Sequence, residues 1–143
     1  MGFLDKVIAC QLDRVKACAE AKPLGLLKDE WERRGFAHKP SIPNRFRSAL
    51  QQPGMSLIAE IKRASPSRGI MATDLSARDQ AKLYEKAGTR AVSVLTEEKY
   101  FRGSLADLSE VAASIDLPVL HKDFIVSPYQ LWEGALAGAT AVL

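Results

Sequence analysis

The stretch LPVLHKDFIVSPYQLWEGALAGATAVL, residues 117–143, contains the signals of a strand, a helix and the start of another strand. Its opening apolar run is short enough for a buried strand. Ser127 then offers an N-cap, Pro128 suits the first helical position, and Gln130 can complete a capping box. Gly138 stands where a helix usually ends in the left-handed conformation that glycine favours. This order predicts a parallel β/α unit.

Two similar units precede this one along the chain. Strands are expected at 57–62 and 91–97, and helices at 76–87 and 104–115. The three complete units take about 28 residues each. Eight such units, preceded by residues 1–56, would make roughly 280 residues, within the usual range for a (β/α)8 barrel. We therefore expect an α/β fold of the (β/α)8 TIM-barrel family, with strand 1 to the start of strand 4, about the first half of the barrel, in residues 57–143.

Residues 1–56 follow a different pattern and are expected to form an N-terminal helical extension. Apolar positions three and four residues apart predict an amphipathic first helix, and these positions are Leu4, Val7, Ile8, Leu12 and Val15. The expected helices of the extension cover residues 3–21, 24–34 and 45–50. Between the last two, residues 35–44 contain two prolines and indicate a connector.

The composition limits the class of protein. The chain has 143 residues and a mass of 15.7 kDa, with 47% hydrophobic and 26% charged residues. This is enough apolar material for a globular core, and it excludes a disordered or collagen-like chain. The 20 Lys and Arg and the 17 Asp and Glu are spread along the sequence. We therefore expect no nucleic-acid or membrane partner, while the small positive charge suits an anionic small molecule.

Two cysteines, Cys10 and Cys18, lie in the first predicted helix. Eight residues of helix separate their Cα atoms by about 12 Å, which is beyond the reach of a disulfide. Neither cysteine has a His or Cys at the spacing of a metal site. We therefore expect reduced thiols in a cytoplasmic protein and no metal ligand.

Charged side chains stand at the carboxyl ends of two predicted strands. In 57–62, alternation directs Ile58, Glu60 and Lys62 to one face and the apolar residues between them to the other. Lys122 stands at the same end of the third strand. Enzymes with this architecture have their sites at the carboxyl ends of the strands, which makes Glu60, Lys62 and Lys122 candidate catalytic residues. The alternative is an internal ion pair that only fills the barrel.

Four blocks of the sequence resemble the indole-3-glycerol phosphate synthase family, a group of decarboxylating cyclases of tryptophan biosynthesis. They are IAEIKRASPSRGI, AVSVLTEEKYF followed by RGSL, LPVLHKDFIVSPYQ, and AGATAVL. The resemblance covers essentially the whole chain and implies a carbon–carbon lyase without a metal or organic cofactor. Its substrate would be 1-(2-carboxyphenylamino)-1-deoxyribulose 5-phosphate, which is cyclised with loss of carbon dioxide and water.

The resemblance also implies roles for the charged residues. Lys122, in the KDF block, is similar to the general acid that protonates the ribulose carbonyl or helps water to leave. Lys62 resembles the lysine that holds the anionic groups of the substrate. Glu60 resembles the glutamate that orients the lysines and stabilises the positive charge developing on the anilino nitrogen.

Other positions match substrate-binding residues of the family. Ser65 matches a serine that hydrogen-bonds the substrate, with an ordinary loop or capping serine as the alternative. Phe101 and Phe124 match the aromatic residues beside the anthranilate ring, with Leu95 beneath them and Leu143 as a further candidate. Without the resemblance, these residues would be assigned to the core. Glu97 falls on the Leu95 face, but we do not expect it to touch substrate.

The chain also departs from the family pattern. His121 stands where arginine is commoner, and alternation directs it toward the helices, so we expect it to pack. LWEGALAG replaces a commoner YEARAAG, and Gly134 within that helix costs up to about 1 kcal/mol relative to alanine. The family takes its general base, a substrate-binding asparagine and most of its phosphate site from strands five to eight, which these 143 residues do not contain.

Two hypotheses follow from the sequence. In the first, the chain is a truncated N-terminal part of a synthase and is inactive alone, and a missing C-terminal half completes the site. In the second, it is a non-catalytic half-barrel module that self-associates or binds a phosphorylated ligand. Exposed sheet edges would favour self-association in either case. A phosphoribosylanthranilate isomerase is a third candidate, but the EIKRASPS block does not favour it.

Overall fold

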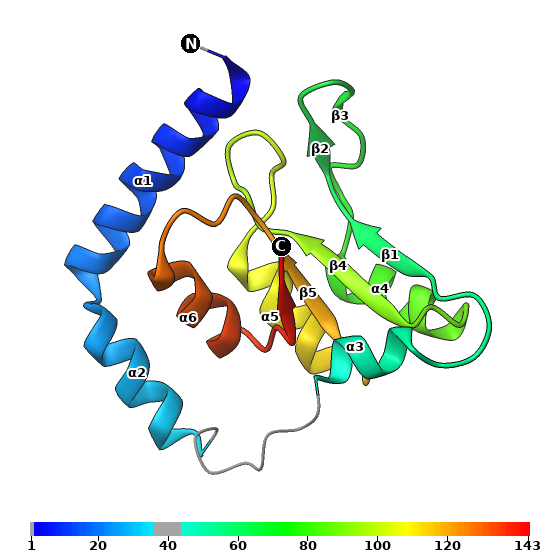
Figure 1. Ribbon diagram of the computed structural model, residues 1–143. Coiled ribbons are helices and arrows are strands. Elements are labelled where there is room, and N and C mark those ends of the chain that lie inside the picture. Colours follow the sequence, from blue (N-terminus) through cyan, green and yellow to red (C-terminus); the bar gives the residue numbers. More distant parts are fainter. Residues whose placement is uncertain (1, 36–43) are drawn as a thin grey trace.

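The computed structural model describes residues 2–35 and 44–143 (Figure 1). The two prolines of the expected connector lie outside these residues. A four-stranded parallel sheet forms the centre of the structure, in the order β1-β4-β5-β6. Its strands are β1 (Ile58–Ile61), β4 (Ala91–Leu95), β5 (Val119–Lys122) and β6 (Ala141–Val142). Each of the four expected strands is thereby confirmed, and the two expected at 57–62 and 91–97 are shorter than expected.

Three helices connect these strands and cover one face of the sheet (Figure 1). They are α4 (Ala77–Lys86), α5 (Leu105–Ser114) and α6 (Pro128–Leu136). The predicted capping box of Ser127 and Gln130 is formed at the start of α6. At the start of α5, Ser104 accepts a hydrogen bond from the Asp107 amide at 3.0 Å. Gly138 has a φ of 94° after α6, as the predicted left-handed end requires.

The main core lies between the sheet and these helices. Ile61, Val92 and Val94 point toward the helices and are buried with residues of α4 and α5. This is the face opposite to that of Glu60 and Lys62, so the predicted alternation is confirmed. The parallel register pairs Glu60 with Ser93, and Leu95 with Lys122, which aligns the carboxyl ends of three strands.

The N-terminal helices are α1 (Phe3–Ala21), α2 (Leu24–Arg33) and α3 (Arg45–Leu50), close to the predicted bounds. Val15, Leu27 and Tyr129 form a second apolar cluster that joins α1 and α2 to α6. The Tyr129 hydroxyl donates to the backbone carbonyl oxygen of Lys22 at 2.9 Å, just after α1. The division into residues 1–56 and 57–143 stays a prediction.

A two-stranded hairpin follows β1 where only a loop is expected from the sequence. It pairs β2 (Ala64–Ser65) with β3 (Gly69–Ile70) in antiparallel fashion. Strands of two residues have no alternating pattern, so the sequence contains no signal for them. Gly69 has a φ of 66°, a conformation that glycine adopts without a steric penalty.

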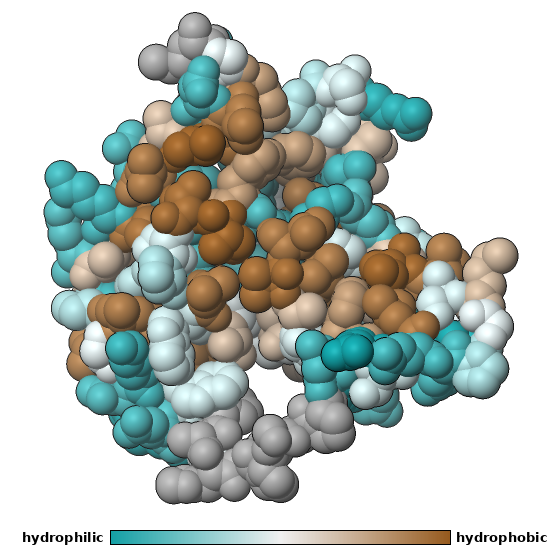
Figure 2. Space-filling view, in the orientation of Figure 1, coloured by the Kyte–Doolittle hydropathy of each residue, from teal (hydrophilic) through white to brown (hydrophobic). Residues whose placement is uncertain are grey.

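Apolar side chains remain exposed at both edges of the sheet. Leu57 and Ile58 at the β1 edge are 57% and 40% exposed, and Val142 and Leu143 at the β6 edge are 45% and 68% exposed. Figure 2 shows apolar residues gathered across the face on which the chain ends. Among the helices of the described residues, none has the length and hydropathy needed to cross a bilayer.

Candidate active site

A cavity of about 250 Å³ lies at the carboxyl ends of the parallel strands. Its lining residues come from the strands and the loops that follow them: Glu60, Lys62, Leu95, Phe101, Lys122, Asp123, Phe124 and Leu143. Seven of the eight candidate site residues named from the sequence, including the further candidate Leu143, therefore meet in one cavity. Their distances along the chain are large, and the parallel register brings them together.

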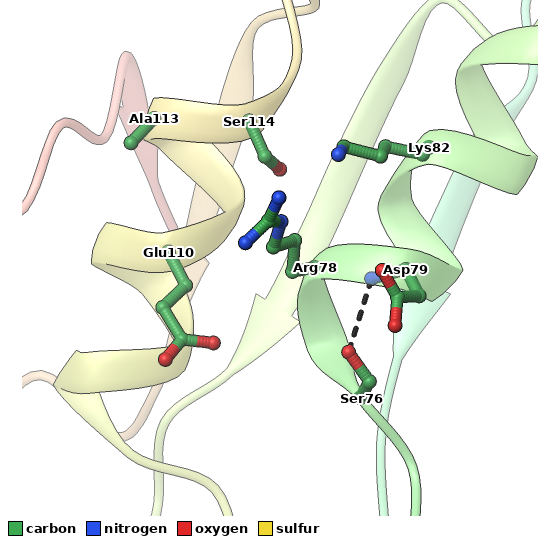
Figure 3. A pocket seen from close by; sticks show the side chains of 7 residues that line it. All are labelled: Ser76, Arg78, Asp79, Lys82, Glu110, Ala113 and Ser114. Atoms are coloured by element: carbon green, nitrogen blue, oxygen red, sulfur yellow. Dashed lines mark hydrogen bonds between the residues drawn. The ribbon is translucent and has the colours of Figure 1, made fainter.

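A larger hollow of about 600 Å³ lies between α4 and α5, in the outer helical layer (Figure 3). It is lined by charged groups of both signs, including Arg78, Lys82 and Glu110. Figure 3 shows the Arg78 side chain reaching toward Ser114. None of the residues named from the sequence lines this hollow. We therefore take the smaller cavity as the candidate active site.

One carboxylate holds two lysines in the candidate site. Glu60 Oε1 lies 2.8 Å from Lys62 Nζ, and Glu60 Oε2 accepts a hydrogen bond from Lys122 Nζ at 2.6 Å. Burial by itself would raise the pKa of Glu60, but the hydrogen bonds from Lys122 and Lys62 outweigh it and lower that pKa. The carboxylate is therefore charged at neutral pH, and the two ammonium groups are held side by side.

An apolar wall stands next to these charges. The rings of Phe101 and Phe124 lie 6.2 Å apart at 41°, a tilted aromatic contact. Leu95 is buried and lines the same cavity. The cavity thus combines a surface that suits a planar ring with cations that suit acidic groups.

Ser65 is the one named site residue that does not line the cavity. It is buried in β2, where its hydroxyl accepts a hydrogen bond from the Arg68 amide at 3.3 Å. Its hydroxyl also lies 3.4 Å from that of Ser67. These contacts are those of a residue that shapes the hairpin, and a contact between Ser65 and substrate stays a prediction.

Asp123 also lines the cavity, although it is not among the site residues predicted from the sequence. Its carboxylate accepts hydrogen bonds from Gln11 Nε2 at 2.8 Å, Thr96 Oγ1 at 2.5 Å and the Phe124 amide at 2.7 Å. Burial raises the pKa of Asp123, while the hydrogen bonds from Thr96 and Phe124 partly offset that effect. Its position in the sequence, between Lys122 and Phe124, is a signal from which its place in the cavity could have been predicted. Its contact with helix α1 could not be read from the sequence.

His121 and Glu97 lie outside the cavity, as expected from the sequence. His121 is 1% exposed, and its Nε2 lies 2.9 Å from the Thr96 hydroxyl. Its ring packs against α6 at Gly134, where a side-chain Cβ would overlap the His121 Nδ1. Glu97 is 2% exposed and bonds to its own loop. Within the described ranges, no group of three or more His, Cys, Asp or Glu side chains is arranged to hold a metal ion.

Comparison with known proteins agrees with these observations. A family model described as indole-3-glycerol phosphate synthase matches residues 4–143. The indole-3-glycerol phosphate synthase of Desulfosudis oleivorans is 44% identical over 145 residues, covering 99% of this chain and 53% of the relative. That of Mycolicibacterium smegmatis is 43% identical over 140 residues, covering 98% and 49%. That of Parafrankia sp. is 55% identical over 96 residues, covering 67% and 36%.

The chain spans about half the length of the curated relatives that it matches from end to end. The helices and the four-stranded parallel sheet are those of a partial (β/α)8 barrel, so the expected fold class is confirmed. The family model covers nearly all of the sequence, and the relatives carry the same name. The chain belongs to the indole-3-glycerol phosphate synthase family.

Proposed function

We propose that this chain supplies the proton donor, the anion-binding lysine and the aromatic wall of an indole-3-glycerol phosphate synthase site. The reaction is the ring closure and decarboxylation of 1-(2-carboxyphenylamino)-1-deoxyribulose 5-phosphate to indole-3-glycerol phosphate, carbon dioxide and water. One observation carries the proposal: Glu60 holds Lys62 and Lys122 beside two phenylalanine rings, in a chain of this family.

Lys122 is the proposed general acid. Its ammonium group has the proton that ring closure requires, and it faces the cavity at the end of β5. The Glu60 carboxylate at 2.6 Å fixes the direction of the Lys122 side chain and places a negative charge against it. Such a contact holds a proton donor in place before substrate arrives, which reduces the cost of orienting it during the reaction.

Lys62 and Glu60 are proposed to act on the charges of the substrate. Lys62 Nζ lies 2.8 Å from Glu60 and remains partly exposed, so an acidic group of the substrate can reach it. Besides orienting the lysines, Glu60 is proposed to stabilise the positive charge that develops on the anilino nitrogen. A nearby carboxylate lowers the energy of such a cation.

Phe101, Phe124 and Leu95 are proposed to bind the aryl part of the substrate. Their side chains line one cavity, and two tilted rings offer faces and edges to a third planar ring. Ser65 is proposed to hydrogen-bond the substrate from the β2–β3 hairpin, beyond β1. This contact requires the Ser65 hydroxyl to exchange the Ser67 contact for one with substrate.

The test is a chimera in which these 143 residues replace the matching part of the Desulfosudis oleivorans relative. Lys122→Ala should lower the turnover of the chimera by about a hundredfold or more, as expected for the loss of a general acid. Lys86→Ala, a change at an exposed lysine of α4, should leave turnover unchanged. Circular dichroism checks that each variant folds. A Lys122→Ala chimera that keeps its turnover would refute the assignment.

The 143 residues by themselves are proposed to be inactive. The general base and the phosphate-binding loops that the family draws from later strands are not among them. Their turnover of the substrate should not exceed that of the Lys122→Ala variant. Turnover above this control would show that the residues present are sufficient.

A second candidate function rests on the exposed edges of the sheet. Leu57 and Leu143 lie on or beside the two edge strands and are more than half exposed. Unpaired strand edges with apolar side chains promote association. We therefore propose, as the alternative, a non-catalytic half-barrel module that self-associates or binds a phosphorylated ligand, and the exposed edges favour self-association. Sedimentation velocity tests this proposal, and a single monomer species at all concentrations would contradict it.

The cytoplasm is the proposed location of the protein. Both cysteines, Cys10 and Cys18, are free thiols in the structure. Proteins of oxidising compartments more often pair their cysteines, so free thiols support this proposal. Cell fractionation with an antibody to the chain would test it.

A further inference from the structure

The loop between β4 and α5 is folded around a buried carboxylate. Glu97 is 2% exposed, and its Oε2 accepts hydrogen bonds from the backbone amides of Tyr100 at 2.7 Å and Phe101 at 3.0 Å. Its Oε1 accepts a third from the Lys99 amide at 3.1 Å. Three backbone donors therefore converge on one side chain. A buried carboxylate is stable in such a position because hydrogen bonds replace its lost hydration.

A carboxylate suits this arrangement better than an amide. Ionised glutamate is an acceptor at both oxygens, whereas glutamine presents an NH2 group in place of one of them. An NH2 group that faces a backbone N–H cannot accept its hydrogen bond. The backbone N–H would then have no acceptor, and the two donor groups would repel each other. The loop geometry thus depends on the charge of Glu97 and on its length.

The same loop is fixed at further points along its backbone. Gly103 donates its amide to the Glu97 carbonyl oxygen at 2.9 Å, and a Cβ at Gly103 would overlap the Leu95 carbonyl oxygen. The Phe101 carbonyl oxygen accepts a hydrogen bond from the Ala64 amide at 3.2 Å, at the start of the hairpin. Phe101 is therefore held at both its amide and its carbonyl group.

Helix α1 supports the outer side of the loop. The Phe3 ring lies 5.1 Å from that of Tyr100 in an edge-to-face contact, and Lys99 Nζ donates to Cys10 Sγ at 3.2 Å. Tyr100 and Phe101 are adjacent in the sequence. The Tyr100 ring contacts α1, whereas the Phe101 ring lines the cavity. The loop is thus packed between the N-terminal helix and the candidate site.

We propose that Glu97 is a positioning residue that determines the affinity of the site for a planar aryl group. It acts through Phe101, because its hydrogen bonds fix the backbone from which that ring projects toward Phe124. It does not act through the charges of Glu60 and the lysines. The identity of the aryl group as part of the synthase substrate rests on the proposed function.

The test compares two neighbouring glutamates of the full chain. Glu97→Gln and Glu98→Gln remove the same charge from adjacent positions, but Glu98 is exposed. Amide hydrogen exchange at Lys99, Tyr100 and Phe101 should accelerate at least about tenfold in Glu97→Gln, because one amide loses its acceptor and the others lose the charge of theirs. It should not change in Glu98→Gln. This measurement requires no ligand and no activity.

Anthranilate serves as the aryl probe, with binding followed by NMR. Its affinity should fall about tenfold in Glu97→Gln and stay unchanged in Glu98→Gln. Phe101→Leu should weaken binding equally without changing amide exchange, and the double variant Glu97→Gln with Phe101→Leu should lose no more affinity than Phe101→Leu alone. Should Glu97→Gln fail to fold, Glu97→Asp, which keeps the charge but shortens the reach, decides by the same measurements.

Three results would overturn the proposal. They are unchanged amide exchange in the Glu97 variants, an equal increase in Glu98→Gln, and anthranilate binding that is absent from the wild type or insensitive to Glu97. Failure of the proposed function would look different, because a Lys122→Ala chimera that keeps its turnover leaves the exchange results intact.

Discussion

Protonation of His121 should destabilise the fold in mildly acidic solution. The ring is 1% exposed, and burial together with repulsion from Arg14 lowers the pKa of His121 from 6.5 to about 4. In the unfolded chain the ring takes up a proton near its ordinary pKa, while in the native state it stays neutral. Below pH 6.5 the unfolded state therefore binds more protons than the native state, and stability falls with pH.

The size of the effect follows from the two pKa values. Between pH 7.5 and pH 5.0, proton uptake by the unfolded chain should reduce the free energy of unfolding by about 2 kcal/mol. By pH 4 the loss should approach about 3 kcal/mol, and it should then level off as the native ring is protonated. Burial raises the pKa of Asp123, so protonation of Asp123 stabilises the native state as the pH falls. The effect of His121 is therefore measured as a difference between the wild type and a His121 variant.

The assay is urea unfolding followed by circular dichroism, for the wild type and for His121→Gln. Glutamine does not titrate, and it keeps a polar group near the Thr96 hydroxyl. The wild type should lose about 2 kcal/mol more than the variant between pH 7.5 and 5.0. The same comparison in an Asp123→Asn background removes the opposing group, and the second histidine, His38, is common to all variants. Equal losses in wild type and variant, or an NMR titration of His121 near pH 6.5, would refute the argument.

Three further predictions concern the stability of the full chain and use urea unfolding at neutral pH. Gly134→Ala should cost about 1 to 3 kcal/mol despite its better helix propensity, because its Cβ would overlap His121, and a smaller cost in a His121→Ala background would confirm that cause. Ser127→Ala should cost about 1 kcal/mol through loss of the α6 cap, and an unchanged midpoint would contradict this. Asp107→Asn should cost about 2 kcal/mol by weakening its two hydrogen bonds from Arg63, and a loss within error of zero would show that the pair is not stabilising.

Local signals account for the agreement between the predicted and observed elements. Helix caps, glycine ends and alternating side chains depend on neighbours within a few residues, so the sequence contains them in full. The same alternation places Glu60 and Lys122 on one face of the sheet, and both stand near its carboxyl end because parallel strands end together. The resemblance to a family then names their roles, which spacing alone cannot do.

Other parts of the site depend on contacts between distant segments. Asp123 meets Gln11 across 112 residues, and this contact exists only because α1 packs beside α6. Glu97 shares a face of the strand pattern with Leu95, yet it turns into its own loop once the strand has ended at Leu95. No periodic pattern extends beyond the end of a strand, so only the folded loop decides that direction.

The sequence by itself determined the order of the β/α units, their caps, the family and the face on which Glu60, Lys62 and Lys122 meet. These are properties of local spacing and of residue identity. The tertiary structure alone decided that the Glu60 carboxylate contacts both lysines and that the Glu97 carboxylate accepts a hydrogen bond from the Phe101 amide. Such contacts depend on the packing of helices and loops, because a side chain selects its partner only when distant segments have come together.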